Sequence, residues 1–330
     1  MIAISCAVVG AGFVGSSMCE VFAERGVNVY SYDKAGKRPQ GVNPFQAVSV
    51  SELVEHCEQQ EGFSGIFFVS VPTPMQETGE CDLSIVEGVL RELANAPRQN
   101  YKLRVAVVKS TVQPGSCARW NRLFSGKLSV VHSPEFLRER TALQDMRDQN
   151  RIVIGGDTEA LDKVEVVFAS AFPNVPIIRT NTTTSEMVKY FTNVQLTARL
   201  VLSCEFCEIC NKLNDNGNKI NYDEVVRIAS LDDRLGGSHM TVPGHDGIMG
   251  ARGSCFPKDL GALTYLASKL GIANSLLKAI KNKNLALVHP DHRDWEKMVG
   301  RGVSVKVVKQ GRFPIHPIVA KVWQTFVGSI

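Results

Sequence analysis

Hydrophobic positions in the first half of the chain fall into short runs of strand length, separated by stretches with a helical period. The run Ile4–Val9 leads through several glycines into a pattern in which Val14, Met18 and Phe22 share one helix face. Strands alternating with helices predict an α/β fold of Rossmann type, a doubly wound parallel sheet that binds ligands beyond the carboxyl ends of its strands. The expected strands are Ile4–Val9, Val27–Tyr32, Gly65–Val71, Arg104–Lys109, Leu128–His132 and Arg151–Ile154.

A second part of the chain is predicted from one long helical pattern, Ser185–Leu213, which contains no proline or glycine. At 1.5 Å per residue this helix would span roughly 40 Å. Its apolar residues surround most of the helix, which is typical of a buried helix. We therefore expect a helical central domain built on this spine, which also packs against a partner subunit. The apolar residues are Met187, Val188, Phe191, Val194, Leu196, Leu200, Val201 and Phe206.

The glycines after the first strand match a dinucleotide-binding pattern, because Gly10, Gly12 and Gly15 are spaced as G-x-G-x-x-G. The next strand ends in Asp33, where an acidic residue would accept the ribose hydroxyls. A carboxylate there would repel a 2′-phosphate, so NAD is favoured over NADP. Strand, loop, helix and acid are all present, which makes the pattern specific. The residues expected at the cofactor are Gly10, Gly12, Phe13, Val14, Gly15 and Asp33.

Composition and charge describe an ordinary soluble protein of 330 residues, long enough for two domains. The net charge of +4 does not indicate nucleic-acid binding. Residues 278–330 hold ten Lys or Arg against three acids, so this basic segment could meet phosphates, an acidic partner or only water. No apolar run approaches the roughly 20 residues that span a bilayer. The apolar start runs directly into the glycine loop, so it is interpreted as a strand and not as a signal peptide.

The nine cysteines show no repeated spacing. Cys204, Cys207 and Cys210 lie three apart and would form one stripe on a helix. A zinc site needs a fourth ligand, and none is evident nearby. We expect no metal, and we interpret these cysteines as small core residues of a protein in a reducing compartment, the cytoplasm.

The stretch Gly253–Lys258 places Cys255 just before a predicted helix, with Pro257 near its first position and Asp259 in its first turn. A thiol at a helix N-terminus beside a lysine tends to be ionised and nucleophilic. The alternative is a buried cysteine behind a proline turn. The dinucleotide pattern in the same chain favours the first interpretation, because a nucleophilic thiol beside a hydride acceptor can oxidise an aldehyde through a thioester.

Two pairs of polar residues have helical spacing. Lys189 and Asn193 lie four apart on the long helix and share a face. Lys189 either points inward, where it needs a role, or extends to water. Glu135 and Glu139 are also four apart, and the alternative for them is a surface turn paired with the neighbouring arginines.

Two more candidates end or follow strands. Thr111 follows a strand and is either a site residue or an ordinary cap or turn residue. His132 ends a strand and is either a base or a histidine whose hydrogen bonds are satisfied in the core.

Taken together, these segments resemble the UDP-glucose/GDP-mannose dehydrogenase family, which oxidises a nucleotide sugar to its uronic acid with two NAD. The resemblance covers residues from about 4 to 265, in the order that the family has. It implies an NAD-dependent oxidoreductase of polysaccharide biosynthesis and a homodimer formed through the helix at 185–213. The segments that carry it are Gly10–Gly15, Val71–Pro74 with Gly79 and Asp82–Ser84, Lys109–Val112, Ser133–Glu139, Arg151–Gly156, Ser185–Tyr190 with Asn193, and Gly253–Asp259.

The resemblance implies a role for each matching catalytic residue. Cys255 would attack the C6 aldehyde after the first hydride transfer and become a thioester in the second. Lys189 and Asn193 would stabilise the oxyanion at O6. Asp259 with Thr111 would hold or deprotonate a water, and Glu139 would activate the hydrolytic water. Further cofactor contacts are expected from Thr73, Pro74, Thr111 and Glu139, and substrate contacts from Glu135, Phe136, Leu137, Lys189, Asn193, Arg234 and Gly253.

The chain departs from the family pattern in two places. Arg252 stands in Gly250–Gly253, where the family has glycine, and would either bind an anionic group or block the sugar. The family's third domain, which grips UDP, has no counterpart signature after residue 265. We therefore expect an NAD-binding domain at 1–184, a helical domain with the catalytic cysteine at 185–270, and a short basic segment at 271–330.

UDP-glucose is the first candidate substrate. A catalytically inactive NAD-binding or partner protein and a one-step hydroxy-acid dehydrogenase are the alternatives.

Overall fold

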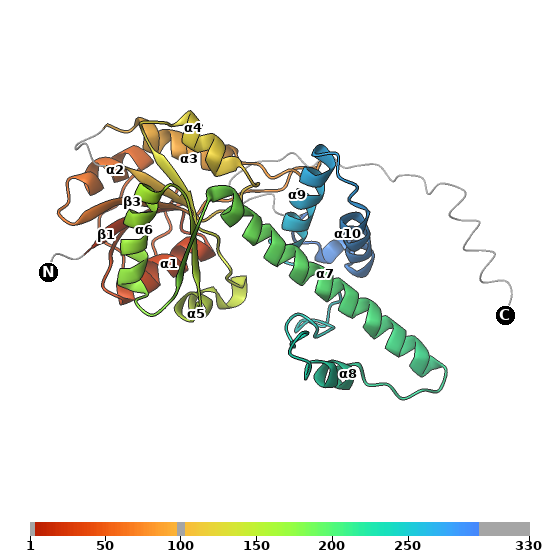
Figure 1. The fold of residues 1–330 in the computed structure, drawn as a ribbon. Coiled ribbons are helices and arrows are strands. Elements are labelled where there is room, and N and C mark those ends of the chain that lie inside the picture. Colours follow the sequence, from red (N-terminus) through yellow and green to blue (C-terminus); the bar gives the residue numbers. More distant parts are fainter. Residues whose placement is uncertain (1–3, 98–102, 297–330) are drawn as a thin grey trace. The chain divides into compact units, whose positions relative to one another are not determined.

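The computed structural model describes residues 4–97 and 103–296, and the basic segment from residue 297 onward lies outside the described residues. Seven strands form one sheet in the order β2-β1-β3-β4-β5-β6-β7. Figure 1 shows this sheet with helices on both of its sides. The five strands β1 to β5 are parallel, as the sequence predicts. The strands are β1 (Ser5–Val9), β2 (Asn28–Tyr32), β3 (Phe63–Val69), β4 (Val105–Val108), β5 (Ser129–His132), β6 (Ile152–Gly155) and β7 (Ile177–Thr180).

The last two strands differ from the expected parallel sheet. β6 pairs with β5 in antiparallel direction and only through His132 and Gly155, and β7, which the sequence pattern did not predict, pairs with β6. The chain between β5 and β6 contains a three-residue turn, η1 (Glu139–Thr141), and a six-residue helix, α5 (Ala142–Arg147). This helix is roughly 9 Å long, and the chain after it enters β6 from the carboxyl edge of β5. β6 therefore approaches β5 from beyond its carboxyl end.

Helices cover both faces of the sheet, and alternate strand residues feed two separate cores. Cys6 and Val8 of β1 join the core under α1, α5 and α6, whereas Ala7 and Val9 join the core under α2, α3 and α4. This alternation is what a strand buried on both faces requires, and it confirms the doubly wound fold. The helices on the sheet are α1 (Phe13–Glu24), α2 (Val50–Glu58), α3 (Ser84–Asn95), α4 (Ser116–Leu123), α5 and α6 (Thr158–Ala171).

The long helix α7 (Thr182–Asp215) has 34 residues and begins three residues before its predicted start. Asn181 caps it by accepting a hydrogen bond from the Thr184 backbone N–H at 2.8 Å. The buried carboxylate of Glu186 accepts hydrogen bonds from the backbone N–H groups of Gly115 and Cys117, at 2.6 and 2.7 Å. These are unpaired donors at the start of α4, so this contact anchors α7 to the sheet.

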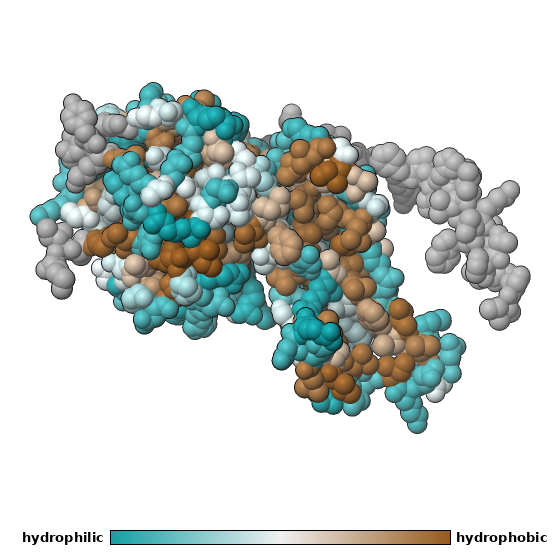
Figure 2. Space-filling model, in the orientation of Figure 1, coloured by the Kyte–Doolittle hydropathy of each residue, from teal (hydrophilic) through white to brown (hydrophobic). Residues whose placement is uncertain are grey.

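The sequence predicts that the apolar residues of α7 are buried, but within a single chain several of them are exposed. Val194 and Val201 are buried, but Met187, Phe191 and Phe206 are 41, 63 and 54% exposed. Figure 2 shows hydrophobic surface over the region where α7 and α8 (Tyr222–Ala229) lie. The helix therefore has one apolar face in the core and another that the described residues leave about half exposed.

The remaining helices, α9 (Phe256–Lys269) and α10 (Ser275–Leu287), pack against α7, and a short turn, η2 (Pro290–His292), follows them. Cys204, Cys207 and Cys210 are buried in a small core with Tyr222 and Val242, as expected for core cysteines. Among the described residues no cluster of side chains suits a metal ion, and no helix is long and apolar enough to cross a membrane.

Candidate active site

The glycine loop leaves room for a dinucleotide at the start of α1. Gly10 has φ of 95°, and a Cβ there would lie 2.4 Å from the Ser70 carbonyl oxygen, so this turn requires glycine. A Cβ on Gly12 would meet no atom within 4 Å, which leaves the backbone open on the side where a pyrophosphate would approach. Gly12 caps α1 without a side-chain hydrogen bond, so the first N–H groups of the helix can bind phosphate.

Asp33 lies beside this loop at the end of β2, where the ribose of NAD would bind. Its carboxylate accepts hydrogen bonds from the backbone N–H groups of Ala11, at 2.7 Å, and Ala35, at 2.9 Å. Each carboxylate oxygen has a second lone pair, so the group can still accept hydroxyl hydrogen bonds. The loop, the helix start and this carboxylate fit NAD. Phe13, Val14 and Gly15 form the first turn of α1 next to them.

Alanine at Gly12 and at Gly15 should separate cofactor binding from folding. Gly12→Ala should change the free energy of unfolding by no more than about 1 kcal/mol, but its methyl group should weaken NAD binding at least tenfold. Gly15→Ala should lower the melting temperature, because its Cβ would lie 1.9 Å from the Gly10 carbonyl oxygen. Thermal unfolding and titration with NAD measure the two effects. Unchanged NAD affinity in Gly12→Ala would contradict a phosphate site at this loop.

Two further loops at the carboxyl edge of the sheet meet around Cys81. The Cys81 thiol lies 3.8 Å from the carbonyl oxygen of Thr73 and 3.6 Å from that of Thr111. Thr73 and Pro74 follow β3 and Thr111 follows β4, so the structure brings together two of the loops in which the sequence places cofactor contacts. None of these three residues lines the cavity that Cys255 lines.

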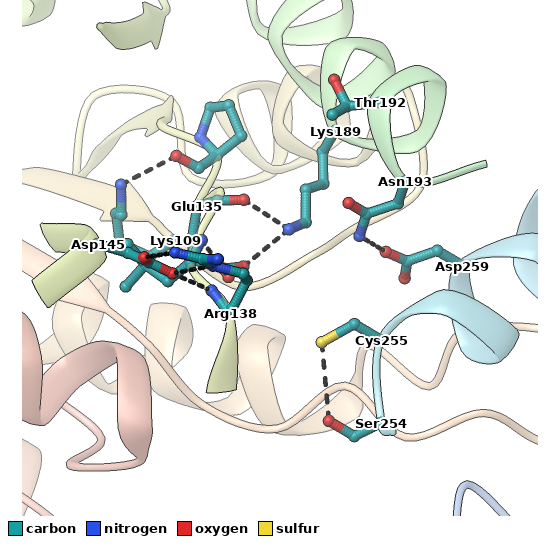
Figure 3. Close-up of polar contacts among 12 residues, drawn as sticks. Lys109, Glu135, Arg138, Asp145, Lys189, Thr192, Asn193, Ser254, Cys255 and Asp259 are labelled. Carbon is teal, nitrogen blue, oxygen red and sulfur yellow. Dashed lines mark hydrogen bonds and ion pairs between the residues drawn. The ribbon is translucent and has the colours of Figure 1, made fainter. Parts of the chain in front are cut away.

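Four predicted site residues meet where α7, α9 and the loop after β5 come together (Figure 3). The Lys189 ammonium group donates hydrogen bonds to the backbone carbonyl of Glu135, at 2.5 Å, and to its carboxylate, at 2.9 Å. Lys189 is 3% exposed, so it points inward and does not extend to water. On the next turn of α7, the Asn193 amide donates to the Asp259 carboxylate at 2.6 Å. Glu135 is buried and is not part of a surface turn.

A cavity of about 470 Å³ opens beside these residues. Six of the predicted residues line it: Glu135, Phe136, Leu137, Lys189, Asn193 and Cys255. Arg151 and Ile152 also line it, because β6 begins beyond the end of β5. The cavity therefore joins the cysteine to a wall that the sequence pattern did not assign to the site.

The other predicted residues do not line this cavity. Asp259 is fully buried behind it, and Glu139 lies close to the cysteine segment, because the Ser254 hydroxyl donates to its carboxylate at 3.4 Å. Arg234 is directed to solvent with its side chain 90% exposed, and it pairs with Asp232 at 2.6 Å. Thr111 and Gly253 also lie outside the lining.

Cys255 precedes the first residue of α9, as expected, but the prediction of an ionised thiol is wrong for this state. Burial raises the pKa of the Cys255 thiol, the carboxylates of Glu135 and Asp259 raise it further, and Lys189 and Lys258 only partly oppose them. The thiol is therefore protonated at neutral pH. The helix start and one lysine, which are visible in the sequence, favour the thiolate. Burial and the two carboxylates that the fold brings near the thiol disfavour it more strongly.

Burial lowers the pKa of the Lys189 ammonium group, but Glu135, Asp259 and Cys255 together with the hydrogen bond to Glu135 raise it above its usual value. Lys189 is thus a permanent cation beside the cysteine. Lys258, the lysine that the sequence places beside Cys255, is buried and pairs with Asp259 at 2.7 Å. In the sequence Lys258 lies between Cys255 and Asp259, two predicted catalytic residues, and this position could have identified it as a site residue.

His132 is not suited to act as a base near neutral pH. Its Nδ1 lies 2.9 Å from the Ser185 hydroxyl, and its Nε2 is buried with no partner among the described residues. Burial lowers the pKa of His132 to about 3, and the charges of Lys109 and Lys189 add to this shift. The histidine stays neutral and links β5 to α7.

Arg252, the residue that departs from the family pattern, pairs with the carboxylate of Asp246. Its side chain is 21% exposed. The charge that could bind an anion is thus already compensated within the loop before α9.

Comparison with known proteins connects this geometry to one family. The model of the NAD binding domain of the UDP-glucose/GDP-mannose dehydrogenase family matches residues 4–171, and that of the family's central domain matches residues 183–286. The first match identifies NAD as the cofactor of the glycine loop. A UDP-glucose dehydrogenase from Pyrobaculum islandicum superimposes with a TM-score of 0.70 at 28% identity, over 86% of this chain and 68% of that one.

Curated relatives give the same result. The putative UDP-glucose 6-dehydrogenase YtcA of Bacillus subtilis is 30% identical over 298 residues, which is 84% of this chain and 66% of the relative. The GDP-mannose 6-dehydrogenase of Pseudomonas aeruginosa is 30% identical over 307 residues, 84% of this chain and 67% of the relative. The chain spans about two thirds of the length of these relatives. With both family models matched in order, it belongs to the UDP-glucose/GDP-mannose dehydrogenase family.

Proposed function

We propose that this protein is an NAD-dependent nucleotide-sugar dehydrogenase that oxidises C6 of a UDP-hexose, with UDP-glucose as the first candidate, to the uronic acid in two oxidations. The observation that carries the proposal is the cavity in which Cys255, Lys189 and Asn193 meet, in a chain that also holds a complete NAD loop. Relatives named as UDP-glucose and GDP-mannose 6-dehydrogenases support the class of substrate.

NAD, when bound, accepts the hydride in each oxidation. The chain's own residues hold and activate the sugar. Asn193 and Lys189 face the cavity as donors and would bind O6, whose negative charge grows as the alcohol proton leaves. Asp259, fixed by Asn193 and Lys258, would hold the water that receives this proton, with Thr111 in support.

The thiol would retain the aldehyde. Cys255 Sγ forms a bond to the aldehyde carbon while its proton passes to the carbonyl oxygen, and the carbon remains on sulfur as a thioester after the second oxidation. Glu139, next to the cysteine segment through Ser254, would activate the water that cleaves the thioester. Glu135, Phe136 and Leu137 form the cavity wall that would hold the hexose.

A panel of nucleotide sugars, followed by the absorbance of NADH, tests this proposal. UDP-glucose, GDP-mannose and the UDP-N-acetylhexosamines are each supplied at limiting concentration with excess NAD. Two NADH per sugar are expected for the true substrate. One NADH per substrate would instead indicate a one-step dehydrogenase, and NAD binding without turnover of any sugar would indicate an inactive partner protein.

We also propose that residues 1–184 bind NAD and that residues 185–270 carry the thiol and the contact between subunits. In this proposal the protein works as a homodimer in the cytoplasm. An exposed stripe on α7 supports the dimer, because its members lie three, four or eleven residues apart, which is one turn or three turns of helix, and so form one apolar face. Sedimentation at micromolar concentration tests it, and a monomer there would refute it. The stripe consists of Met187, Phe191, Leu202, Phe206, Ile209 and Leu213.

A further inference from the structure

The buried charges around the candidate cavity do not balance. Five buried residues near it are ionisable as acids or lysines, and each carboxylate has its own lysine at hydrogen-bond distance, 2.9 Å for Lys189 with Glu135 and 2.7 Å for Lys258 with Asp259. The third lysine, Lys109, has no acidic partner within 4.0 Å among the described residues. The five are Lys109, Glu135, Lys189, Lys258 and Asp259, none more than 8% exposed.

Lys109 is held in place by neutral oxygens. Its ammonium group donates to the Ser133 hydroxyl and to the Pro134 carbonyl, both at 3.1 Å, in the loop that carries Glu135 (Figure 3). The Lys109 side chain lines the same cavity as Cys255. A buried cation that is bound but not neutralised is costly, so a site that keeps one is suited to a negative charge that arrives during its work.

The groups that face Lys109 do not remove this excess. Glu135, from the loop after β5, attracts the charge of Lys109 but is already paired with Lys189 on α7. The charge of Lys189 repels that of Lys109. His132, at the end of β5, is neutral, and α6 contributes the ring of Phe168, 5.7 Å away. With all three lysines protonated, the set carries one more positive than negative charge.

We propose that Lys109 is the charge-balancing residue of this site, whose positive charge is compensated by an anion in the cavity, either the thiolate of Cys255 or the oxyanion of the substrate. The second case rests on the proposed function, and the first does not. Lys109 acts through the electric field and through the loop that it holds, as a positioning residue for Glu135 and Lys189. The first residue of the sequence segment Lys109–Val112 thereby gains a role.

Burial lowers the pKa of Lys109 to about 8, with Glu135 raising it and Lys189 lowering it. The charge of Lys109 is therefore present below about pH 8 and lost above it. An anion in the cavity stabilises the protonated form and moves this transition to higher pH. The attraction of the cavity for anions should consequently decline as the pH rises through this range.

Alkylation of Cys255 by iodoacetate, an anion, and iodoacetamide, its neutral counterpart, tests the proposal without NAD or sugar. The rate constant for iodoacetate divided by that for iodoacetamide reports the charge of the cavity, because the thiolate fraction is the same for both reagents and cancels. In the wild type this ratio should fall as the pH rises from 7 to 9. In Lys109→Met this ratio should be about tenfold lower than in the wild type at pH 7, a factor that corresponds to one pKa unit of interaction. It should also be nearly independent of pH. Cys255→Ser gives the background labelling.

Two variants keep the test decisive. Lys212→Met, which removes a lysine with a 79% exposed side chain, should leave the ratio unchanged. Lys109→Arg, whose charge does not titrate in this range, should retain the preference for iodoacetate at pH 9, and it serves if Lys109→Met does not fold. Equal ratios in the wild type, Lys109→Met and Lys109→Arg at every pH would overturn the proposal. Because the assay needs no turnover, failure of the dehydrogenase assay alone would not affect it.

Discussion

Cys255→Ser should stop formation of the uronic acid from the substrate. A serine hydroxyl is far less acidic than a thiol and attacks an aldehyde far more slowly, and an ester formed there would be hydrolysed slowly. We expect the rate of uronic acid formation to fall by at least roughly 10³-fold. Product analysis by mass spectrometry, together with NADH released per sugar, measures the effect.

The first oxidation should survive in part in this variant, because the donors Lys189 and Asn193 remain in the cavity. The NADH yield should then fall from two toward one per sugar, with aldehyde trapped by a hydroxylamine reagent. Cys210→Ser, in the small core of α7, provides a matched loss of one thiol and should keep the yield at two. If Cys255→Ala formed uronic acid at the wild-type rate, the thiol would be a bystander.

The sheet was predictable because its information is local. The parallel strands inside the sheet are buried on both faces, and such a strand appears in the sequence as a continuous apolar run, as in Val105–Val108. β7 lacks this pattern, since Ile178 is 47% exposed and Arg179 is also exposed at the edge of the sheet. The direction of β6 depends on the short path of α5 through space, and no local pattern of hydrophobic residues encodes that path.

The candidate site was likewise predictable where the information is local and not where it depends on distant segments. Spacing on a helix placed Lys189 and Asn193 on one face, and the structure buries both on that face. The partners of Lys109 lie 24 and 25 residues further along the chain, so its surplus charge emerges only when β4 and the loop after β5 meet. The protonated state of Cys255 has the same origin, because Glu135 reaches it from a segment 120 residues earlier.

Lys189→Met should reduce both catalysis and stability, and the two losses can be separated. Removing a preorganised donor to the oxyanion lowers kcat by about 10²–10³-fold. The variant also leaves the Glu135 carboxylate, 5% exposed, without its ion-pair partner. Breaking a buried pair costs about 3–5 kcal/mol, and the lower end is expected because Lys109 still faces Glu135. Urea unfolding and steady-state kinetics measure the two effects.

The double variant Lys189→Met with Glu135→Gln distinguishes the causes. Glutamine removes the unpaired charge, so most of the lost unfolding free energy should return, whereas kcat should stay low because the ammonium donor of Lys189 to the oxyanion is still missing. Lys212→Met, which breaks only an exposed pair with Asp215, should change stability by less than about 1 kcal/mol. If the double variant regained kcat along with stability, Lys189 would act on folding alone. The oxyanion would then depend on Asn193 and on the buried charge of Lys109, which the iodoacetate ratio would detect independently.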